Sequence, residues 1–445
     1  MNGQIDRIRF TRHQNGWVEF QVKLYMDAIV DEILKGIDGT VSIVLAGGAG
    51  RGETSVKVCG RKVLPVNDLD IYVITDNPVS EKVLHDVAEK ATARLNLGME
   101  TFSFYRTSPT MLDKFYIDLR NHTRSELAHL PPLLKYYEIR YSGTVLYGED
   151  VLSDMPDYSL DDVPMAEGAR FLLNRLCSFC EYFLPEYLNR QLAQPERETV
   201  IYFCGKVFLS IAEALTLLSG KFESSYERRC QILEETYQQD FPELYSKMPD
   251  LPAKVRMFTD FRAAPNFNGF PHDPVATWFT TRDYAWVVVQ YYLEKLFKIE
   301  RGGNMGEYSR KMHRNMWKSY LNEYLRSVLK DSRLGFATPL LPVVTPLAHL
   351  YLNLKYLSRI WALERQVYLK PLLDWKAPDL KLYAALPLIL FSIDRTGKID
   401  DSMLLAARSY LTRLFPSRVN GGLTYEGIHQ SFGTAYRLYA HSNIV

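Results

Sequence analysis

Two aspartates and a glycine pair within one stretch of the chain could together handle phosphate. The residues from Val41 to Thr75 begin as an apolar run rich in β-branched residues, break at Gly47-Gly48 and end in a second apolar run that contains Asp68 and Asp70. Side chains alternate along a strand, so Asp68 and Asp70 should point the same way. Two carboxylates this close repel each other unless a cation lies between them, and we therefore expect a divalent metal there.

The types of ligand indicate which metal and which substrate. Carboxylate oxygens suit a hard ion such as Mg²⁺, with Mn²⁺ as an alternative, and such an ion usually takes further ligands from substrate phosphates. Glycine has no Cβ, so backbone N–H groups at Gly47-Gly48 can approach a phosphate closely. Together the two features predict a phosphoryl-transfer site. Taken singly, Asp-Leu-Asp could be a solvated strand end and Gly-Gly an ordinary turn.

The order of three motifs resembles a known family, the DNA polymerase β-like nucleotidyltransferases. The motifs are Gly47-Gly48, Arg51-Gly52-Glu53 and Asp68-Leu69-Asp70, and they lie in the first third of the chain. The resemblance implies a nucleotidyltransferase sheet with flanking helices, two metal ions, and a nucleotide contacted by Gly47, Gly48 and Arg51.

One segment departs from the compact members of that family. The chain between Glu53 and Asp68 is longer than in the aminoglycoside nucleotidyltransferases. Its sequence predicts an inserted hairpin formed by Ser55–Val58 and Lys62–Val66. This hairpin would shape access to the nucleotide.

A third carboxylate is expected on a later strand. In the segment Lys114–Arg120, which reads KFYIDLR, the residues Tyr116, Asp118 and Arg120 share one face. A buried, unpaired carboxylate in mid-strand is costly, so Asp118 needs a partner. The family has a third carboxylate beside the first two, and Asp118 matches it in order and context, as a metal ligand and catalytic residue. Alternatively, Asp118 pairs with Arg120 or Arg106.

The remaining elements of the first part are predicted from periodicity and turn residues. Helices are expected at Trp17–Leu34 and Glu81–Leu95, and a further strand at Glu100–Arg106. These form an α+β sheet with helices on one side. The segment Ser142–Asp150 closes this part, where Glu149 and Asp150 could either orient an acceptor or cap the next helix.

Past Pro156 the chain becomes helical, and the expected helices include Ala166–Phe183, Glu198–Leu218 and Ser225–Tyr237. Lys206 is the one cation in the mostly apolar stretch Thr199–Leu218. In several members of the family a helical lysine contacts the triphosphate and a later Ser-Tyr contacts the base. The resemblance therefore assigns these roles to Lys206 and Tyr226. Lys206 could equally lie along the core with its ammonium group in water.

A stretch of mixed character and the C-terminal part complete the chain. Met257–Phe279 breaks the helical pattern with Asn, Gly and Pro residues, and could form a lid, an acceptor pocket or a packed connector. The rest is predicted to be helical, with no motif in the tail after Pro416. We expect a catalytic domain over residues 1–152, a helical domain over 153–300 that completes the cleft, and a C-terminal helical domain over 301–445.

Composition limits the cellular compartment and the binding partners that are expected. The chain has 445 residues, of which 47% are hydrophobic and 24% charged, and a formal net charge of +1. This balance argues against a long nucleic-acid track. Five cysteines without a zinc-like cluster favour a reducing compartment, and Cys177 and Cys180 should simply pack in a helix. Neither a signal peptide nor a membrane span is evident, so a cytoplasmic location without a membrane partner is expected.

The reaction that follows is transfer of an NMP group, with AMP as the default, from an NTP to a hydroxyl group with release of pyrophosphate. Asp68 and Asp70 would hold two Mg²⁺ ions, and Asp118 would help to deprotonate the acceptor. The acceptor could be a small molecule, an RNA end or a protein side chain. Two alternatives are ligation of nucleotides into a signalling oligonucleotide and a non-catalytic regulatory or antitoxin-type module.

Overall fold

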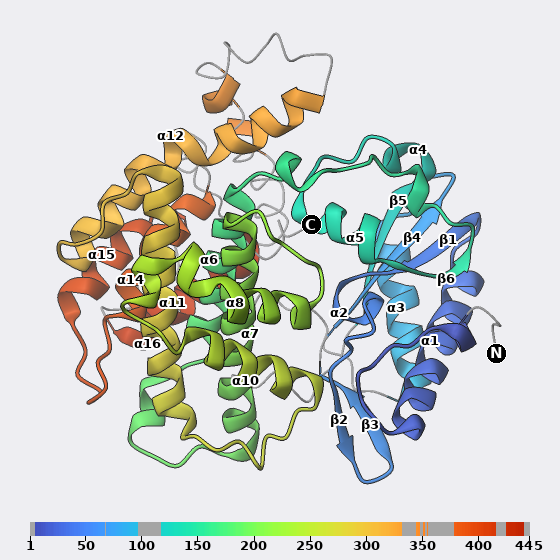
Figure 1. Ribbon diagram of the computed structural model, residues 1–445, viewed down its shortest axis with the longest axis horizontal. Coiled ribbons are helices and arrows are strands. Elements are labelled where there is room, and N and C mark those ends of the chain that lie inside the picture. Colours follow the sequence, from blue (N-terminus) through green and yellow to red (C-terminus); the bar gives the residue numbers. More distant parts are fainter. Residues whose placement is uncertain are drawn as a thin grey trace.

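The computed structural model describes residues 5–66, 68–96, 117–331, 344–347, 350–351, 354, 378–414 and 424–439. Its architecture is α+β, with a four-stranded mixed sheet flanked by helices and a large helical region after it (Figure 1). The fold class expected from the sequence is confirmed. The expected strand at Glu100–Arg106 lies outside the described residues.

The sheet places two of the predicted aspartates side by side. Its strands are β1 (Thr40–Leu45), β4 (Leu69–Thr75), β5 (Ile117–Thr123) and β6 (Thr144–Gly148), in the order β5-β4-β1-β6. β1 runs antiparallel to both of its neighbours, whereas β4 and β5 are parallel. In that parallel pair Asp70 is the register partner of Asp118. The two carboxylate-bearing residues are therefore neighbours across the sheet.

Helices cover both faces of the sheet. α1 (Gly16–Gly36) and α3 (Glu81–Leu95) share a hydrophobic cluster with Ile43, Ile71 and Val73. Ser80 is the N-cap of α3 and accepts a hydrogen bond from the Val83 amide, which fixes the start of the helix. On the other face, α4 (Arg124–Leu127) and α5 (Leu134–Ser142) pack against the alternate residues of β1 and β4, whose side chains point to that face. The expectation of helices on one side was wrong because Val44, Tyr72 and Ile74 give the second face its own apolar surface.

The predicted inserted hairpin is present and docks onto the helical region. Its strands are β2 (Val56–Cys59) and β3 (Lys62–Pro65), which form a separate two-stranded sheet. The Ser55 hydroxyl, just before β2, donates to the backbone carbonyl of Arg262. Lys57 in β2 forms an ion pair of 2.7 Å with Glu198. The insertion thus joins the sheet part to the helices (Figure 1).

The helical region surrounds one large core. Its main helices are α6 (Ala166–Glu181), α7 (Gln194–Leu218), α8 (Tyr226–Asp240), α10 (Leu251–Ala263), α11 (Pro274–Phe297), α12 (Met305–Asp331), α14 (Pro378–Leu390), α15 (Asp401–Leu411) and α16 (Tyr425–Tyr439). Short elements are η1 (Ile5–Arg7), α2 (Gly47–Gly50), η2 (Leu152–Asp154), η3 (Leu160–Asp162), η4 (Pro185–Leu188) and α9 (Pro242–Tyr245).

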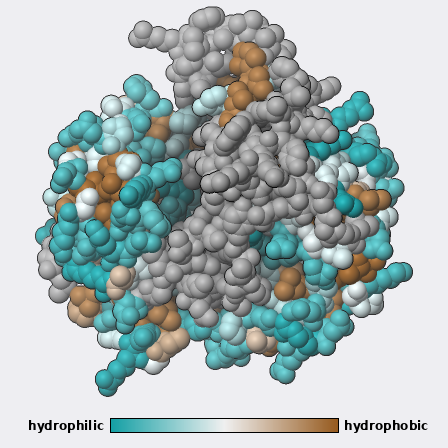
Figure 2. All heavy atoms as spheres, turned by 180° about the vertical axis from the view of Figure 1, so that it is seen from behind, coloured by the Kyte–Doolittle hydropathy of each residue, from teal (hydrophilic) through white to brown (hydrophobic). Residues whose placement is uncertain are grey.

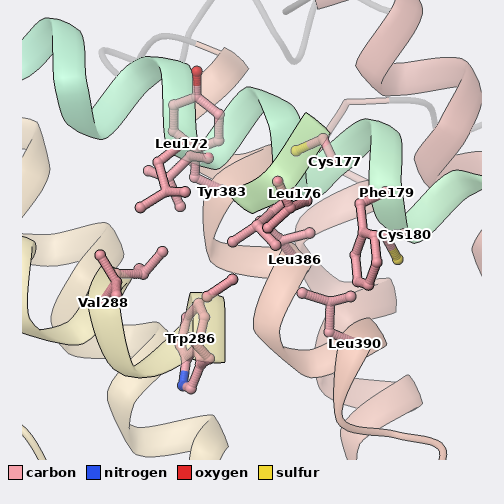
Figure 3. Packing of buried hydrophobic residues seen from close by; sticks show 14 of the residues in the cluster. Leu172, Leu176, Cys177, Phe179, Cys180, Trp286, Val288, Tyr383, Leu386 and Leu390 are labelled. Carbon is pink, nitrogen blue, oxygen red and sulfur yellow. The ribbon is translucent and has the colours of Figure 1, made fainter. Parts of the chain in front are cut away.

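Side chains from distant parts of the sequence meet in this core. Figure 3 shows Leu176 of α6, Trp286 and Val288 of α11, and Leu386 and Leu390 of α14 packed together. The same cluster contains buried cysteines of α6, as expected from the sequence; these are Cys177 and Cys180. Because one cluster includes residues from both sides of the expected boundary at residue 300, the packing has no break there. The three-domain division stays a prediction.

One segment differs from the sequence expectation. Most of Met257–Phe279 is helical, because α10 continues to Ala263 and α11 begins at Pro274. Only residues 264–273 are irregular, and Asp273 caps α11 through the Ala276 amide. The tail after Pro416, which shows no motif, contains α16, whose residues join the large core.

The surface and the longest apolar helix are consistent with a folded core. The face shown in Figure 2 is largely hydrophilic over the described residues, with hydrophobic side chains in small groups. Among the described helices, α7 alone is long and apolar enough to span a membrane by composition. However, 83% of its most apolar window is buried inside the protein, as in a core helix.

Candidate active site

The turn after β1 sits directly against Asp70. Gly47 begins α2 with a φ of +61°, a conformation that favours glycine. A Cβ atom at Gly47 would lie 2.6 Å from Asp70 Oδ2. The backbone amide of Ala46 also donates to the carbonyl of Asp70, at 2.9 Å. The glycine turn and the Asp-x-Asp strand, which were predicted to act together, are therefore in contact.

Negative charge converges at the start of β4. Asp68 directly precedes the strand, and Asp118 is the register partner of Asp70 on β5. Burial, followed by the charges of Asp68 and Asp118, raises the pKa of Asp70 to about 7. A carboxyl group under such repulsion is stabilised by a nearby cation.

The side chain of Asp118 is turned toward an arginine. Its Oδ2 atom accepts hydrogen bonds from Arg120 Nη2 at 2.6 Å and from Arg120 Nε at 3.1 Å. The alternative pairing of Asp118 with Arg120 is thus the one observed. In this arrangement, no three Asp, Glu, His or Cys side chains of the described residues form a metal-binding group. Carboxylate oxygens fit Mg²⁺ in their chemistry, and the metal role of these aspartates stays a prediction.

Lys206 reaches the same site from α7. The charges of Asp68 and Asp70 favour its ammonium form, but burial and the charge of Arg175 outweigh them and lower the pKa of Lys206 to about 7. Its Nζ atom lies 4.6 Å from the ring centroid of Tyr202, one turn earlier on the helix. The structure thus brings Lys206 into the electrostatic environment of the aspartates, and its predicted contact with a triphosphate stays a prediction.

Two arginines of this site were missed from the sequence. The side chain of Arg262 on α10 is 9% exposed, and its Nη2 atom lies 2.5 Å from the Cβ position of Gly48. Arg175 on α6 contributes positive charge at Lys206. The Nε atoms of both arginines are buried without a hydrogen-bond partner, and within the described residues neither guanidinium forms an ion pair with a carboxylate. α6 also contains Arg170 and α10 also contains Arg256, so the sequence alone does not single out Arg175 and Arg262.

Tyr226 supports guanidinium groups in this structure. Its ring centroid lies 4.4 Å from the Arg262 guanidinium, 4.7 Å from that of Arg229 and 4.9 Å from that of Arg51. Arginine over an aromatic face is a favourable cation–π contact. The predicted stacking of a base on Tyr226 stays a prediction, and the ring instead holds Arg262 over the Gly48 backbone here.

The Arg-Gly-Glu motif links the sheet part to α8. Arg51 is buried and pairs with Glu138 at 3.0 Å and with Glu53 at 3.3 Å. Glu53 also pairs with Arg12 at 2.8 Å. Its two oxygens accept hydrogen bonds from the hydroxyl of Ser225 and from the backbone amide that follows it. Arg51 is thus engaged with two carboxylates in this structure, and its predicted contact with a nucleotide stays a prediction.

An aromatic cleft opens beside the two cations. It is a narrow opening between the inserted hairpin, α7 and α10, with room for about one water molecule, and both Lys206 and Arg262 line it. Most of its other lining is apolar.

The two acids after β6 lie among local contacts. Glu149 pairs with Arg124 at 2.9 Å. Asp150 accepts from the amide of Leu152, the first residue of the short helix η2, whose N-cap residue is Val151. The roles expected for Glu149 and Asp150, orienting an acceptor or capping a helix, stay predictions.

Comparisons with known proteins add little to this geometry. Neither a protein-family model nor a curated protein matches the chain. One similar solved structure is spectinomycin adenyltransferase from Enterococcus faecialis, determined with ATP and spectinomycin. The TM-score is 0.34 and the sequence identity 11%, over 59% of this chain and 98% of that chain. A likeness this distant carries no information about activity.

Proposed function

We propose that the protein is a Mg²⁺-dependent nucleotidyltransferase that moves an NMP group, by default AMP, from an NTP to an acceptor hydroxyl and releases pyrophosphate. The observation that carries the proposal is the meeting of three kinds of group between the sheet and α7. These are carboxylates on adjacent strands, a glycine turn in contact with one of them, and cations from three helices. This combination suits a metal-bound triphosphate.

The carboxylates and the turn would divide the work as follows. Asp68 and Asp70 would hold the divalent ions, which supply positive charge to the phosphates when bound. Backbone N–H groups at Gly47-Gly48 would receive phosphate oxygens, since no side chain blocks their approach. Asp118 would accept the proton of the acceptor hydroxyl at a carboxylate oxygen.

The cations would hold the phosphates from the opposite side. Arg262 lies over Gly48, and its Nε atom has no hydrogen-bond partner. The positive charge of Arg175 acts on Lys206. Arginine offers several N–H donors in a fixed plane, which suits phosphate oxygens. Such groups orient a substrate and offset its charge, which is most of what phosphoryl transfer requires of a protein.

The acceptor is a small molecule, an RNA end or a protein side chain, and the experiment that tests the function also distinguishes these. The protein is incubated with each labelled NTP and Mg²⁺, together with candidate acceptors, and the products and the protein itself are analysed by mass. We expect Asp68→Asn and Asp70→Asn to abolish transfer. The matched control Asp86→Asn alters an exposed acid on α3 and should leave transfer intact.

Each result has a clear meaning. Undiminished transfer by the Asp68→Asn, Asp70→Asn double variant would refute the assignment of the site. Failure of the unaltered protein to bind any NTP in the presence of Mg²⁺ would favour the non-catalytic alternative. A soluble oligonucleotide formed from NTPs alone would identify the acceptor as a second nucleotide.

A further inference from the structure

We propose that Arg120 is a positioning residue for the transfer reaction, because it anchors one carboxylate oxygen of Asp118 and leaves the other oxygen available. The assignment rests on the proposed nucleotidyl transfer, in which Asp118 accepts the proton of the acceptor hydroxyl. Arg120 would act only through Asp118, and Tyr72 would in turn hold Arg120.

Both hydrogen bonds from Arg120 to Asp118 end on the same oxygen. Oδ2 accepts from Nη2 at 2.6 Å and from Nε at 3.1 Å. The two donors lie in the rigid plane of the guanidinium group, so together they fix where Oδ2 can lie. Within the described residues no donor is bonded to Oδ1. One oxygen is thus anchored, and the lone pairs of the other are available for a proton or a metal ion.

The strands keep this carboxylate beside Asp70. β4 and β5 are parallel, and their register pairs Asp70 with Asp118 and Tyr72 with Arg120. Residues two apart along a strand share a face, so all four side chains lie on the same face of the sheet. The two acids are therefore neighbours, and two residues further along both strands the tyrosine and the arginine are neighbours as well.

Tyr72 holds the guanidinium group of Arg120 in place. Its hydroxyl oxygen accepts from Arg120 Nη1 at 3.3 Å, and the guanidinium carbon lies 5.8 Å from the centroid of its ring. Tyr72 is 5% exposed, and its ring is stacked on that of His122 at a centroid distance of 5.8 Å and an interplanar angle of 5°. Packing thus fixes the tyrosine. A rigid partner restricts Arg120, and Arg120 restricts Asp118.

The exposure of the pair favours a role in the reaction over a role in folding. The side chain of Asp118 is 27% exposed and that of Arg120 is 18% exposed. An ion pair that is this accessible to water contributes little to the stability of the fold. Its geometry matters more, because misplacing a reacting group by about 1 Å lowers a rate on the order of a hundredfold.

The charge of Arg120 has a second effect, on the binding of a metal ion. Burial, Asp68 and Asp118 raise the pKa of Asp70, and the charge of Arg120 acts against them. The same charge repels a divalent cation. Removal of Arg120 should therefore leave Mg²⁺ binding unchanged or tighter while transfer slows. These opposite responses distinguish a loss of positioning from a loss of the metal site.

Kinetics and binding measurements on the full chain test the assignment. Transfer from α-labelled ATP, with Mg²⁺ and the acceptor that product analysis identifies, gives kcat and the KM for ATP. Arg120→Met removes the guanidinium group, Arg120→Lys restores a positive charge, and Tyr72→Phe removes only the hydroxyl. The matched control is Arg94→Met, because Arg94 of α3 pairs with Asp31 and Glu32 of α1. Isothermal titration with Mg²⁺ measures the metal site of each variant separately.

We expect Arg120→Met to lower kcat on the order of a hundredfold, with little change in the KM for ATP and no weaker binding of Mg²⁺. Arg120→Lys should recover part of the kcat, and Tyr72→Phe should show a smaller loss. Because Tyr72 acts through Arg120, the Tyr72→Phe, Arg120→Met double variant should be no slower than Arg120→Met. Arg94→Met should transfer at the wild-type rate.

The assignment is overturned if Arg120→Met keeps the wild-type kcat, if its Mg²⁺ binding weakens to the same extent that its kcat falls, or if the double variant is much slower than Arg120→Met. Absence of transfer by the unaltered protein is a different result, which would refute the proposed function and this assignment with it. Circular dichroism shows whether Arg120→Met folds, and Arg120→Lys with Tyr72→Phe carries the test if it does not.

Discussion

Asp70 is the residue at which the fold and the proposed reaction make opposite demands. Burial and the charges of Asp68 and Asp118 raise its pKa from 3.8 to about 7. The folded protein therefore binds this proton more tightly than the unfolded chain does. The contribution of Asp70 to the stability of the fold is therefore greatest at low pH and declines as the pH rises from about 4 to 7. A bound divalent ion would remove this cost.

Replacing Asp70 by Asn should stabilise the metal-free protein while abolishing transfer. The neutral amide keeps the shape and removes the repulsion, so the free energy of unfolding should increase on the order of 1–3 kcal/mol at pH 8. Urea denaturation in the presence of a chelator measures this change. At pH 5 the gain should be much smaller, because Asp70 is then protonated in the folded wild-type protein. A loss of stability at pH 8 would contradict the prediction.

Lys206 should give the stability of the protein the opposite pH dependence. Its pKa is lowered to about 7, mainly by burial and by Arg175, so the folded protein releases this proton more readily than the unfolded chain. Stability should therefore increase as the pH rises from 7 toward 10.5. In the Lys206→Met variant this increase should disappear, and binding of tripolyphosphate should weaken. Thermal denaturation at pH 7 and pH 9.5 tests the first effect and titration the second; an unchanged pH profile would refute the assignment.

At the scale of elements, the α2 turn contains two glycines that should respond differently to alanine. Gly47 has a φ of +61° and its added Cβ would collide with Asp70 Oδ2, so Gly47→Ala should lose about 1 kcal/mol or more of stability. At Gly48 the added Cβ meets the end of the Arg262 side chain, which can move. Gly48→Ala should therefore keep its stability but weaken triphosphate binding several-fold.

Denaturation and nucleotide titration of the two variants provide the comparison. Because the glycines are adjacent, each variant serves as the control for the other. Equal losses of stability in both would contradict the assigned geometry, as would unchanged triphosphate binding by Gly48→Ala.

The elements themselves were largely predictable, whereas several contacts of the site were not. The hairpin and α3 follow from local alternation, helical periodicity and the Ser80 cap, all of which are read within a short window of sequence. Arg262 and Arg175 join the site only through the packing of α10 and α6 against α7. Likewise, Asp118 can satisfy its charge with Arg120 two residues away, and sequence alone does not decide between that arginine and a metal.

At the scale of the whole molecule, separate cores are joined by a small apolar cluster between α5 and α7 and by a polar junction. One core lies between the sheet, α1 and α3, and another fills the helical region. Glu53 is central to the junction, since it contacts Arg12, Arg51 and Ser225. Burial opposes its ionisation, but Arg51, Ser225 and Arg12 outweigh this effect and hold the pKa of Glu53 below its usual value.

Glu53→Gln should weaken this junction. Loss of a buried, paired charge costs about 3 kcal/mol, and we expect the two parts to unfold in separate thermal steps at neutral pH. The stabilisation by Glu53 is present above pH 4.5 and is lost as the pH falls through its lowered pKa, so wild type and variant should converge in acid. Calorimetry measures this, with Glu235→Gln as an exposed control on α8. A single, unshifted transition would contradict the prediction.

The burial of α7 has a consequence for how the protein is made. This apolar helix shares its core with α14 and α16, which are synthesised some two hundred residues later. During translation the sheet part can complete its own core early, whereas α7 remains without its final neighbours. Chaperones that recognise apolar segments on the ribosome should therefore engage this region, and a truncated product lacking α14–α16 should be a target for proteolytic quality control.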